Sequence, residues 1–312
     1  MHRTYFFRDL RAKRAMAALF IAMAVLGAAC NGDGGGGGET TDGEESGLLE
    51  RARSEGIRIG FANERPFGFE NEQGEADGEA PAVAREVLKG IGITELESVV
   101  VEFGALINGL RAGRYDMIAA GMFITEERAS QALFTDPDYC STSAFAVPQG
   151  NPQGLTDFQS VAANNDVTLG VVTGGVEVGY AEAAGVPADR LRRFDLTPDL
   201  VDGLKAGRID AFALTAITVR DQVKDLPGFE ATEGFVPVIN GEEQLGCGGF
   251  VFRFEDKEFR DAFNEELVSL RESDEILPLV EKFGFASAET DVAKGKTVED
   301  LIGKPYDYGM NS

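Results

Sequence analysis

An internal repeat constrains the fold of this 312-residue chain more than any other feature. The sequence GLRAGRYD at residues 109–116 recurs as GLKAGRID at residues 203–210. In each copy a helical spacing of apolar residues leads to a glycine, Gly113 or Gly207, that suits a left-handed helix end. An apolar stretch follows the aspartate. Helix, glycine turn and strand make one α/β unit, so the repeat predicts two similar α/β lobes.

The apolar pattern of the rest of the chain fits this division. Further elements are predicted as strands of the first lobe at 57–61, 99–103 and 115–120, strands of the second at 168–172, 191–194 and 210–214, and helices at 80–89, 257–271 and 276–283. Extended segments at 138–148 and 246–253 are interpreted as two chain crossings that form a hinge. We expect the first lobe at 48–146 and 247–290, the second at 147–246, a ligand in the cleft between them, and a polar, peripheral tail at 291–312.

The N-terminus is typical of an exported protein. Residues 1–14 carry five basic residues against one acid, an apolar stretch follows to residue 29, and small residues precede Cys30. The apolar stretch is shorter than the roughly 20 residues that span a bilayer. The segment resembles a lipoprotein signal, which implies that Cys30 is lipidated. Residues 30–47, rich in glycine and acids, are expected to be a flexible tether. The predicted location is the outer face of the cell membrane, lipid-anchored, or the periplasm.

Charge and histidine content exclude several classes of function. The net charge of the chain is −24, and removal of residues 1–29 takes away five of 29 basic and one of 53 acidic residues, which leaves −28. Such a surface repels nucleic acid. The single histidine, His2, lies in the predicted signal, so the mature chain has none. That excludes Ser-His-Asp and Cys-His catalysis and histidine-ligated metal. We expect a monomer with no catalytic residue, cofactor or metal.

Two cysteines remain if Cys30 carries lipid. In an exported protein such a pair usually forms a disulfide, here between Cys140 and Cys247. The alternative is two buried free thiols.

Candidate ligand-binding residues lie just beyond the predicted strands, because open α/β sheets bind ligands outside the carboxyl ends of their strands. These positions are Glu64, Phe67, Phe103, Gly121, Phe123 and Arg128 in the first lobe, and Thr173, Gly175, Val176 and Thr215 in the second. Aromatic rings attract cations by about 0.5–2 kcal/mol per contact. Several phenylalanines beside one glutamate therefore favour a cage for a bulky cation. The alternative is that these rings are ordinary core residues.

Arg128 favours a negatively charged ligand. Thr125 is the expected N-cap of a helix, which places Arg128 in the first turn, where the helix dipole disfavours a cation. A ligand carboxylate held by a bidentate pair explains such an arginine. The alternative is a structural ion pair with Asp136 or Asp138. Across the cleft, Gly175 and Val176 open a helix whose N–H groups can contact the same anion, although a plain turn explains that sequence equally well.

Several segments resemble a known family. DMIAAGMFITEER at residues 116–128, FTDPDY at 134–139 and LGVVTGG at 169–175 are similar to signature segments of the family 3, amino-acid-type extracellular solute-binding proteins. The resemblance covers about residues 56–285. FANERPFGF at 61–69 and GCGGFVF at 246–252 resemble the ectoine- and hydroxyectoine-binding branch.

The resemblance implies a periplasmic-binding-protein fold and a role as the capture subunit of an ABC importer, with its permease as partner. It also implies a carboxylate-binding Arg128, a cage of Phe67, Phe103 and Phe123, and Glu64 on the amidinium of the ligand. Similar amino-acid binders hold the α-ammonium with a second-lobe acid where this chain has Thr215. We therefore expect ectoine or hydroxyectoine, a zwitterion without a primary ammonium. Alternatives are a polar amino acid or a betaine on the same fold, a dehydratase on that fold, or a sensor domain.

Overall fold

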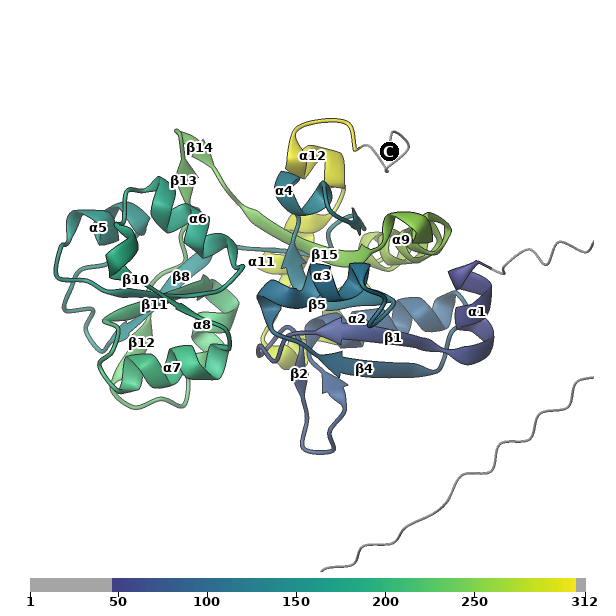
Figure 1. Ribbon diagram of the computed structural model, residues 1–312, viewed down its shortest axis with the longest axis horizontal. Helices are drawn as coiled ribbons and strands as arrows, with labels where there is room; N and C mark the ends of the chain where they lie inside the picture. The colour runs from purple at the N-terminus through teal and green to yellow at the C-terminus, as the bar shows by residue number, and fades with distance from the viewer. Residues whose placement is uncertain (1–46, 307–312) are drawn as a thin grey trace, which may run out of the picture. The chain divides into compact units, whose positions relative to one another are not determined.

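The computed structural model describes residues 47–306, whose strands form two main sheets (Figure 1). The first sheet has the order β4 (Leu96–Val100), β1 (Ile57–Phe61), β5 (Met117–Phe123), β15 (Gly246–Phe252) and β6 (Leu133–Phe134), with β7 (Tyr139–Ser141) also paired to β15. The second has the order β10 (Leu191–Phe194), β9 (Leu169–Val172), β11 (Ala211–Thr215), β8 (Ser143–Pro148) and β12 (Phe229–Ala231). We call each sheet with its covering helices a lobe, so the predicted two-lobed α/β fold is confirmed.

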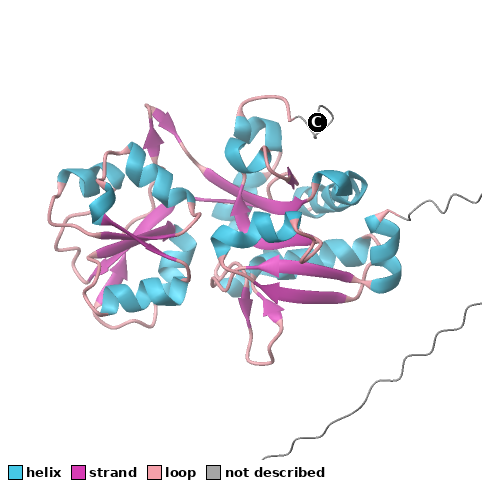
Figure 2. Cartoon of the chain, in the orientation of Figure 1, coloured by secondary structure: helices cyan, strands magenta, loops and turns pink. Residues whose placement is uncertain are grey.

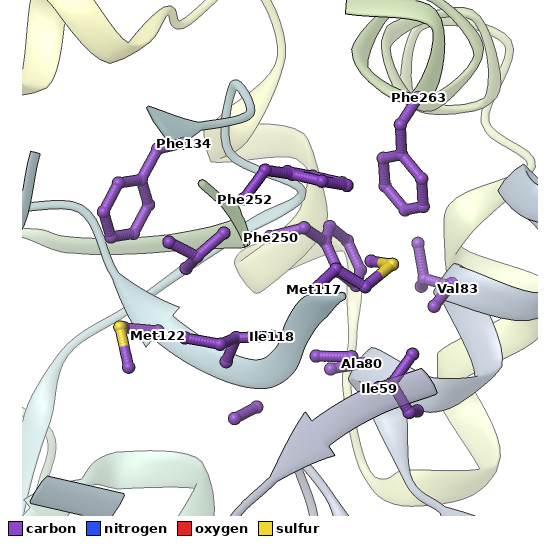
Figure 3. Close-up of a cluster of buried hydrophobic side chains, with 14 of the residues drawn as sticks. Ile59, Ala80, Val83, Met117, Ile118, Met122, Phe134, Phe250, Phe252 and Phe263 are labelled. Atoms are coloured by element: carbon purple, nitrogen blue, oxygen red, sulfur yellow. The ribbon is translucent and has the colours of Figure 1, made fainter. Parts of the chain in front are cut away.

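The first lobe is built around one apolar core. β1 pairs in parallel with β4 and β5, whereas β15 runs antiparallel to β5. Helices α2 (Glu79–Gly90), α9 (Lys257–Glu272) and α10 (Ile276–Val280) pack together, and α3 (Leu106–Arg111) contacts β1 and β5. Figure 3 shows Val83 of α2 and Phe263 of α9 close to Met117, Phe250 and Phe252 of the sheet. Burial of these large side chains is the main force that holds the helices on the sheet. A further helix, α1 (Leu48–Glu55), packs against α9.

The second lobe has an apolar core on each face of its sheet. Helices α5 (Phe158–Ala163) and α6 (Val176–Ala183) pack on one face, and α7 (Thr197–Lys205) and α8 (Ala216–Val223) on the other (Figure 2). Two small hairpins lie outside the main sheets. The first pairs β2 (Phe69–Glu70) with β3 (Ala76–Asp77) in the first lobe, and the other pairs β13 (Val238–Ile239) with β14 (Glu242–Glu243), which follow the last strand of the second sheet in the chain.

The repeat corresponds to matching structural units. In both copies the glycine adopts a left-handed conformation, with φ of +69° at Gly113 and +64° at Gly207. The two aspartates also have the same role. The Asp116 carboxylate accepts a hydrogen bond of 3.0 Å from the backbone N–H of Arg58 in β1, and Asp210 accepts one of 2.8 Å from Thr168 before β9. Each aspartate therefore links the start of the strand that follows it, β5 or β11, to the neighbouring strand, β1 or β9.

The two predicted chain crossings lie side by side as β7 and β15. Cys140 pairs directly with Cys247 in this ladder, and the two form a disulfide. The predicted disulfide is confirmed. The domain boundary at residue 146 remains a prediction. β8 spans that position, and all of β8 is hydrogen-bonded in the second sheet.

The C-terminal segment from residue 291 was expected to be peripheral, but the structure integrates it into the first lobe. After α11 (Ser287–Thr290), which lies in the expected first lobe, it forms a 3₁₀ turn (Asp291–Ala293) and α12 (Val298–Ile302). Ala293 is fully buried beside the disulfide, and Tyr306 is buried in the first-lobe core. The expectation failed because a few well-placed side chains anchor a segment that is otherwise polar. The predicted signal at 1–29, lipidated Cys30 and most of the tether lie outside the described residues.

Candidate functional site

A small cavity of about 30 Å³ lies between the lobes and is lined by both of them. It contains nine of the ten predicted ligand-binding positions, namely Glu64, Phe67, Phe103, Gly121, Phe123, Arg128, Gly175, Val176 and Thr215, together with Ala120, Val172, Glu177 and Leu214. It adjoins a cleft of about 800 Å³, which shares the lining residues Phe103, Arg128, Gly175 and Val176. The tenth predicted residue, Thr173, lines this cleft and not the cavity.

The loop that carries Glu64 and Phe67 is held by backbone hydrogen bonds. Glu64 and Gly68 exchange N–H to carbonyl bonds of 2.8 and 2.9 Å, and the first N–H groups of α2 donate to the carbonyls of Pro66 and Phe67. Gly78 permits this docking, because its φ is +115° and a Cβ there would lie 2.6 Å from the Phe67 carbonyl oxygen. The end of α2 thus fixes the position of the loop.

The Glu64 carboxylate contacts the second lobe. Its Oε1 accepts a hydrogen bond of 3.0 Å from the hydroxyl of Thr218 in α8. Burial and, to a smaller extent, the negative charge of Glu177 raise the pKa of Glu64 to about 7, although the hydrogen bond from Thr218 lowers it. Near neutral pH this group can therefore change its charge.

Three phenylalanines surround the cavity in different ways. Phe67 and Phe123 both pack against Tyr139, with ring centroids 4.9 and 6.1 Å apart, whereas Phe103 lies under the guanidinium of Arg128 at 5.3 Å. Phe67 is 2% exposed and Phe123 6%. Phe67 and Phe123 are thus core residues, as the alternative interpretation held, and they also line the cavity.

Gly121 is required by the aromatic wall. It has a φ of +59°, and a Cβ at this position would lie 2.3 Å from the ring of Phe67. Its carbonyl accepts a bond of 2.6 Å from the Tyr139 hydroxyl. Gly121, Met122 and Phe123 were expected to follow the strand, but they form its last residues in β5.

Arg128 lies in the first turn of α4 (Glu126–Ala129), as predicted, and its N–H donates to the N-cap hydroxyl of Thr125. Its guanidinium donates to the carbonyl of Phe123 at 2.7 Å and, across the lobes, to that of Gly174 at 2.8 Å. Within residues 47–306 it forms no ion pair. Asp136 instead accepts bonds from Asn264 and Val298. Burial lowers the pKa of Arg128, and the charge of Glu177 opposes this.

Glu177 is the charged residue of the cavity lining that the sequence analysis missed. It lies in the first turn of α6, is 4% exposed, and lines the cavity opposite Arg128. Burial raises its pKa to about 7, while its own backbone N–H and the charge of Arg128 lower it. The absence of an acid at Thr215 therefore does not leave the second lobe without an acid in the cavity. Glu177 was missed because it lies on a helix and not at the end of a strand.

A second pair of acids lies behind the aromatic wall. Both carboxylate oxygens of Glu79 and Oδ2 of Asp138 are buried without a hydrogen-bond donor. The two side chains face each other, and burial raises the pKa of each; the charge of Asp138 raises that of Glu79 further. A proton on one carboxyl group supplies the donor that the other lacks. The neighbouring Tyr139 connects this pair to Phe67 and Phe123.

The site therefore combines one buried guanidinium, two carboxyl groups of raised pKa and three aromatic rings. This combination suits a small zwitterion whose anion lies at Arg128 and whose cation lies near the rings and Glu64. Among the described residues, no group of three or more cysteine, histidine or acidic side chains is placed to hold a metal ion. None of the helices between residues 47 and 306 has the length and apolarity needed to cross a bilayer.

The family model of the bacterial extracellular solute-binding proteins, family 3, matches residues 57–286. This chain is a member of that family. The structure of EhuB in complex with hydroxyectoine superposes with a TM-score of 0.74 at 36% identity, over 81% of this chain and 97% of that one.

Two curated relatives are also similar in sequence. A probable amino-acid ABC transporter periplasmic-binding protein, y4tE of Sinorhizobium fredii, is 33% identical over 81% of this chain and 85% of its own length. The histidine-binding periplasmic protein of Salmonella typhimurium is 28% identical over 73% of this chain and 86% of its own length.

Proposed function

We propose that this family 3 protein captures ectoine or hydroxyectoine and delivers it to the permease of an ABC importer. The proposal rests on one observation. Arg128, Glu64 and the three phenylalanines line the same cavity between the lobes. The similarity to EhuB, whose structure contains hydroxyectoine, and to the ABC transporter protein y4tE supports it.

Binding follows from the charges of the cavity. The ligand carboxylate lies against the guanidinium of Arg128, whose position is already fixed by its bonds to Phe123 and Gly174. The N–H group of Val176, at the start of α6, adds a donor from the second lobe, whereas that of Gly175 already donates to the carbonyl of Val172 at 3.0 Å. The ring cation lies among Phe67, Phe103 and Phe123, with Glu64 as its counter-charge. A delocalised cation is weakly hydrated, so an aromatic cage can desolvate it at low cost.

Glu177 supports a second candidate, a cationic or polar amino acid. A second-lobe carboxylate in the cavity can pair with an α-ammonium, which ectoine lacks. The histidine-binding relative fits this candidate. The dehydratase alternative receives less support, because Glu64 lies among aromatic rings that suit binding, and the relatives named above are described as binding proteins.

Isothermal titration calorimetry of the mature protein separates these candidates. We expect heat from ectoine and hydroxyectoine, and far weaker binding of glutamine, arginine and histidine. Arg128→Ala should weaken ectoine binding by about 2–5 kcal/mol, because a buried carboxylate loses its partner. Arg111→Ala, which removes an exposed arginine of α3, is the control. Tight binding of an amino acid without heat from ectoine would contradict the ectoine proposal and favour the second candidate. Mass spectrometry of the recovered ligand tests for turnover.

The N-terminal predictions complete the proposal. Residues 1–29 are the export signal, and lipidated Cys30 holds a monomeric receptor at the outer face of the membrane through the tether 30–47. Membrane fractionation of Cys30→Ala tests this. Unchanged membrane attachment of the variant would contradict lipid anchoring.

A further inference from the structure

The chain continues beyond the segment that matches the family model. The match ends at residue 286, and the structure describes a further 20 residues, 287–306, which we call the strap. The strap begins with α11, passes the disulfide at Ala293, and continues through α12, which lies beside α4 in Figure 1.

The strap is firmly attached to the first lobe near Arg128. The Tyr306 hydroxyl donates to the carbonyl of Ala132 at 2.7 Å and accepts from the N–H of Phe134 at 2.9 Å. The N–H of Val298 donates to Asp136 at 3.0 Å, and Lys304 forms an ion pair with Glu126 of α4. These partners belong to residues 126–136, so the strap is tied to the segment that begins with α4, the helix that carries Arg128.

One side chain of the strap reaches the second lobe. Oε1 of Glu289 accepts a bond of 3.2 Å from the guanidinium of Arg220 in α8. Its other oxygen accepts a bond of 3.0 Å from the backbone N–H of Ala286, which holds the carboxylate in this orientation. The Glu289 side chain is 13% exposed and that of Arg220 52%, so the pair lies at the edge of the contact between the lobes.

The same helix α8 touches the ligand site. Thr218 donates to Glu64 in the cavity, and Asp221 pairs with Arg65 at 3.6 Å. The position of α8 in which Arg220 reaches Glu289 is therefore the position in which Thr218 reaches Glu64. A contact that favours this position also favours the arrangement in which the cavity is closed by both lobes.

We propose that the strap latches the closed state, with Glu289 and Arg220 as positioning residues that slow the release of ligand. This rests on the proposed capture function. The latch does not touch the ligand, so it acts on the equilibrium between open and closed lobes. A pair that forms only on closure contributes its full energy to ligand retention.

The test uses ectoine and the mature protein. For a partly exposed ion pair we expect Glu289→Gln to raise the Kd for ectoine about two- to five-fold. The increase should appear in koff, measured by stopped flow, because the association step precedes the latch. Arg220→Gln should have the same effect, and the double variant should bind no more weakly than either single variant. The control is Asp291→Asn, which removes an equal charge from a pair with Lys294 inside the strap.

The outcomes separate the latch from the capture function and from a purely structural role. If Glu289 only stabilises the fold, the thermal midpoint falls without a change in koff, which would overturn the proposal. If the wild type does not bind ectoine, the capture proposal fails and the latch is tested without ligand. Hydrogen exchange of the α8 amides should then be faster in Glu289→Gln and unchanged in Asp291→Asn. Equal exchange in the two variants would also overturn the latch.

Discussion

The hydroxyl of Thr218 in the second lobe donates a hydrogen bond of 3.0 Å to the carboxylate of Glu64 in the first. The Thr215 hydroxyl donates in turn to Thr218 at 2.9 Å. Thr215 thus orients Thr218, and Thr218 connects the helix α8 to the proposed cation site. The threonine that stands where similar amino-acid binders carry an acid therefore acts on the site through a neighbour.

Replacement of Thr218 by valine should weaken ectoine binding by about 1 kcal/mol. Valine preserves the shape but leaves Glu64 without this donor in a partly buried setting. Calorimetry at one pH measures the loss, and Thr218→Ser, which retains the hydroxyl, should bind nearly as well as the wild type. Equal affinities of the valine and serine variants would contradict a role for this bond.

The affinity for ectoine should increase as the pH rises from 6 to 8. The pKa of Glu64 is raised to about 7 by burial and by Glu177, so at pH 6 most of the ligand-free protein carries a proton on this group. A protonated Glu64 cannot pair with the ligand cation, and loss of one ionised group over this range corresponds to about a tenfold change in Kd. Titrations at several pH values measure it. Glu64→Gln should bind weakly with a flatter profile, and a flat wild-type profile would refute the assignment.

The cage predicts that aromatic character matters at Phe123 beyond size. Phe123→Leu keeps an apolar side chain but loses the cation–π contact, which should weaken ectoine by about 0.5–2 kcal/mol. Phe158→Leu, in the core of the second lobe, should lower the thermal midpoint with little effect on affinity. If both variants change affinity equally, the effect at Phe123 is one of packing alone.

The buried pair Glu79 and Asp138 should make stability depend on pH. Their folded-state pKa values are raised above the unfolded ones, so the stability they contribute is complete below the unfolded pKa and is lost as the pH rises through the folded pKa. Glu79→Gln supplies a permanent donor to Asp138. We expect it to raise the free energy of unfolding at pH 8 by about 1–3 kcal/mol and to change it little at pH 4.5.

Urea unfolding at the two pH values measures this difference. Glu72→Gln, at an exposed glutamate of the same region, is the control. A Glu79→Gln variant that is destabilised equally at both pH values would show that the pair shares no proton.

The fold was predictable because the two copies of the repeat form the same local structure. The glycine ends a helix and the aspartate ties two strands together in each lobe, so the pattern survives in sequence. The position of Arg128 was predictable for the opposite reason. A cation in the first turn of a helix is locally unfavourable, and the structure places this residue in the first turn of α4 and in the lining of the cavity.

Glu177 shows what such reasoning cannot detect. An acid in the first turn of a helix is favoured by the helix dipole, so its presence there carries no signal. Its role follows from burial between the lobes, which depends on contacts distant in sequence. The strap was missed for a related reason, because Tyr306 and Ala293 are single anchors in a polar segment and produce no periodic pattern.

The disulfide between the crossing strands has a consequence for how this receptor could be re-engineered. Because Cys140 and Cys247 are linked, the chain between them, which holds the second lobe, leaves and re-enters the first lobe at one covalent point. We therefore expect that the second lobe could be exchanged as one unit. A lobe from a relative could replace it without altering the path of the rest of the chain. Glu177 and Thr215 would leave with it, while Arg128 and Glu64 would remain, so each half of the ligand's recognition could be varied separately.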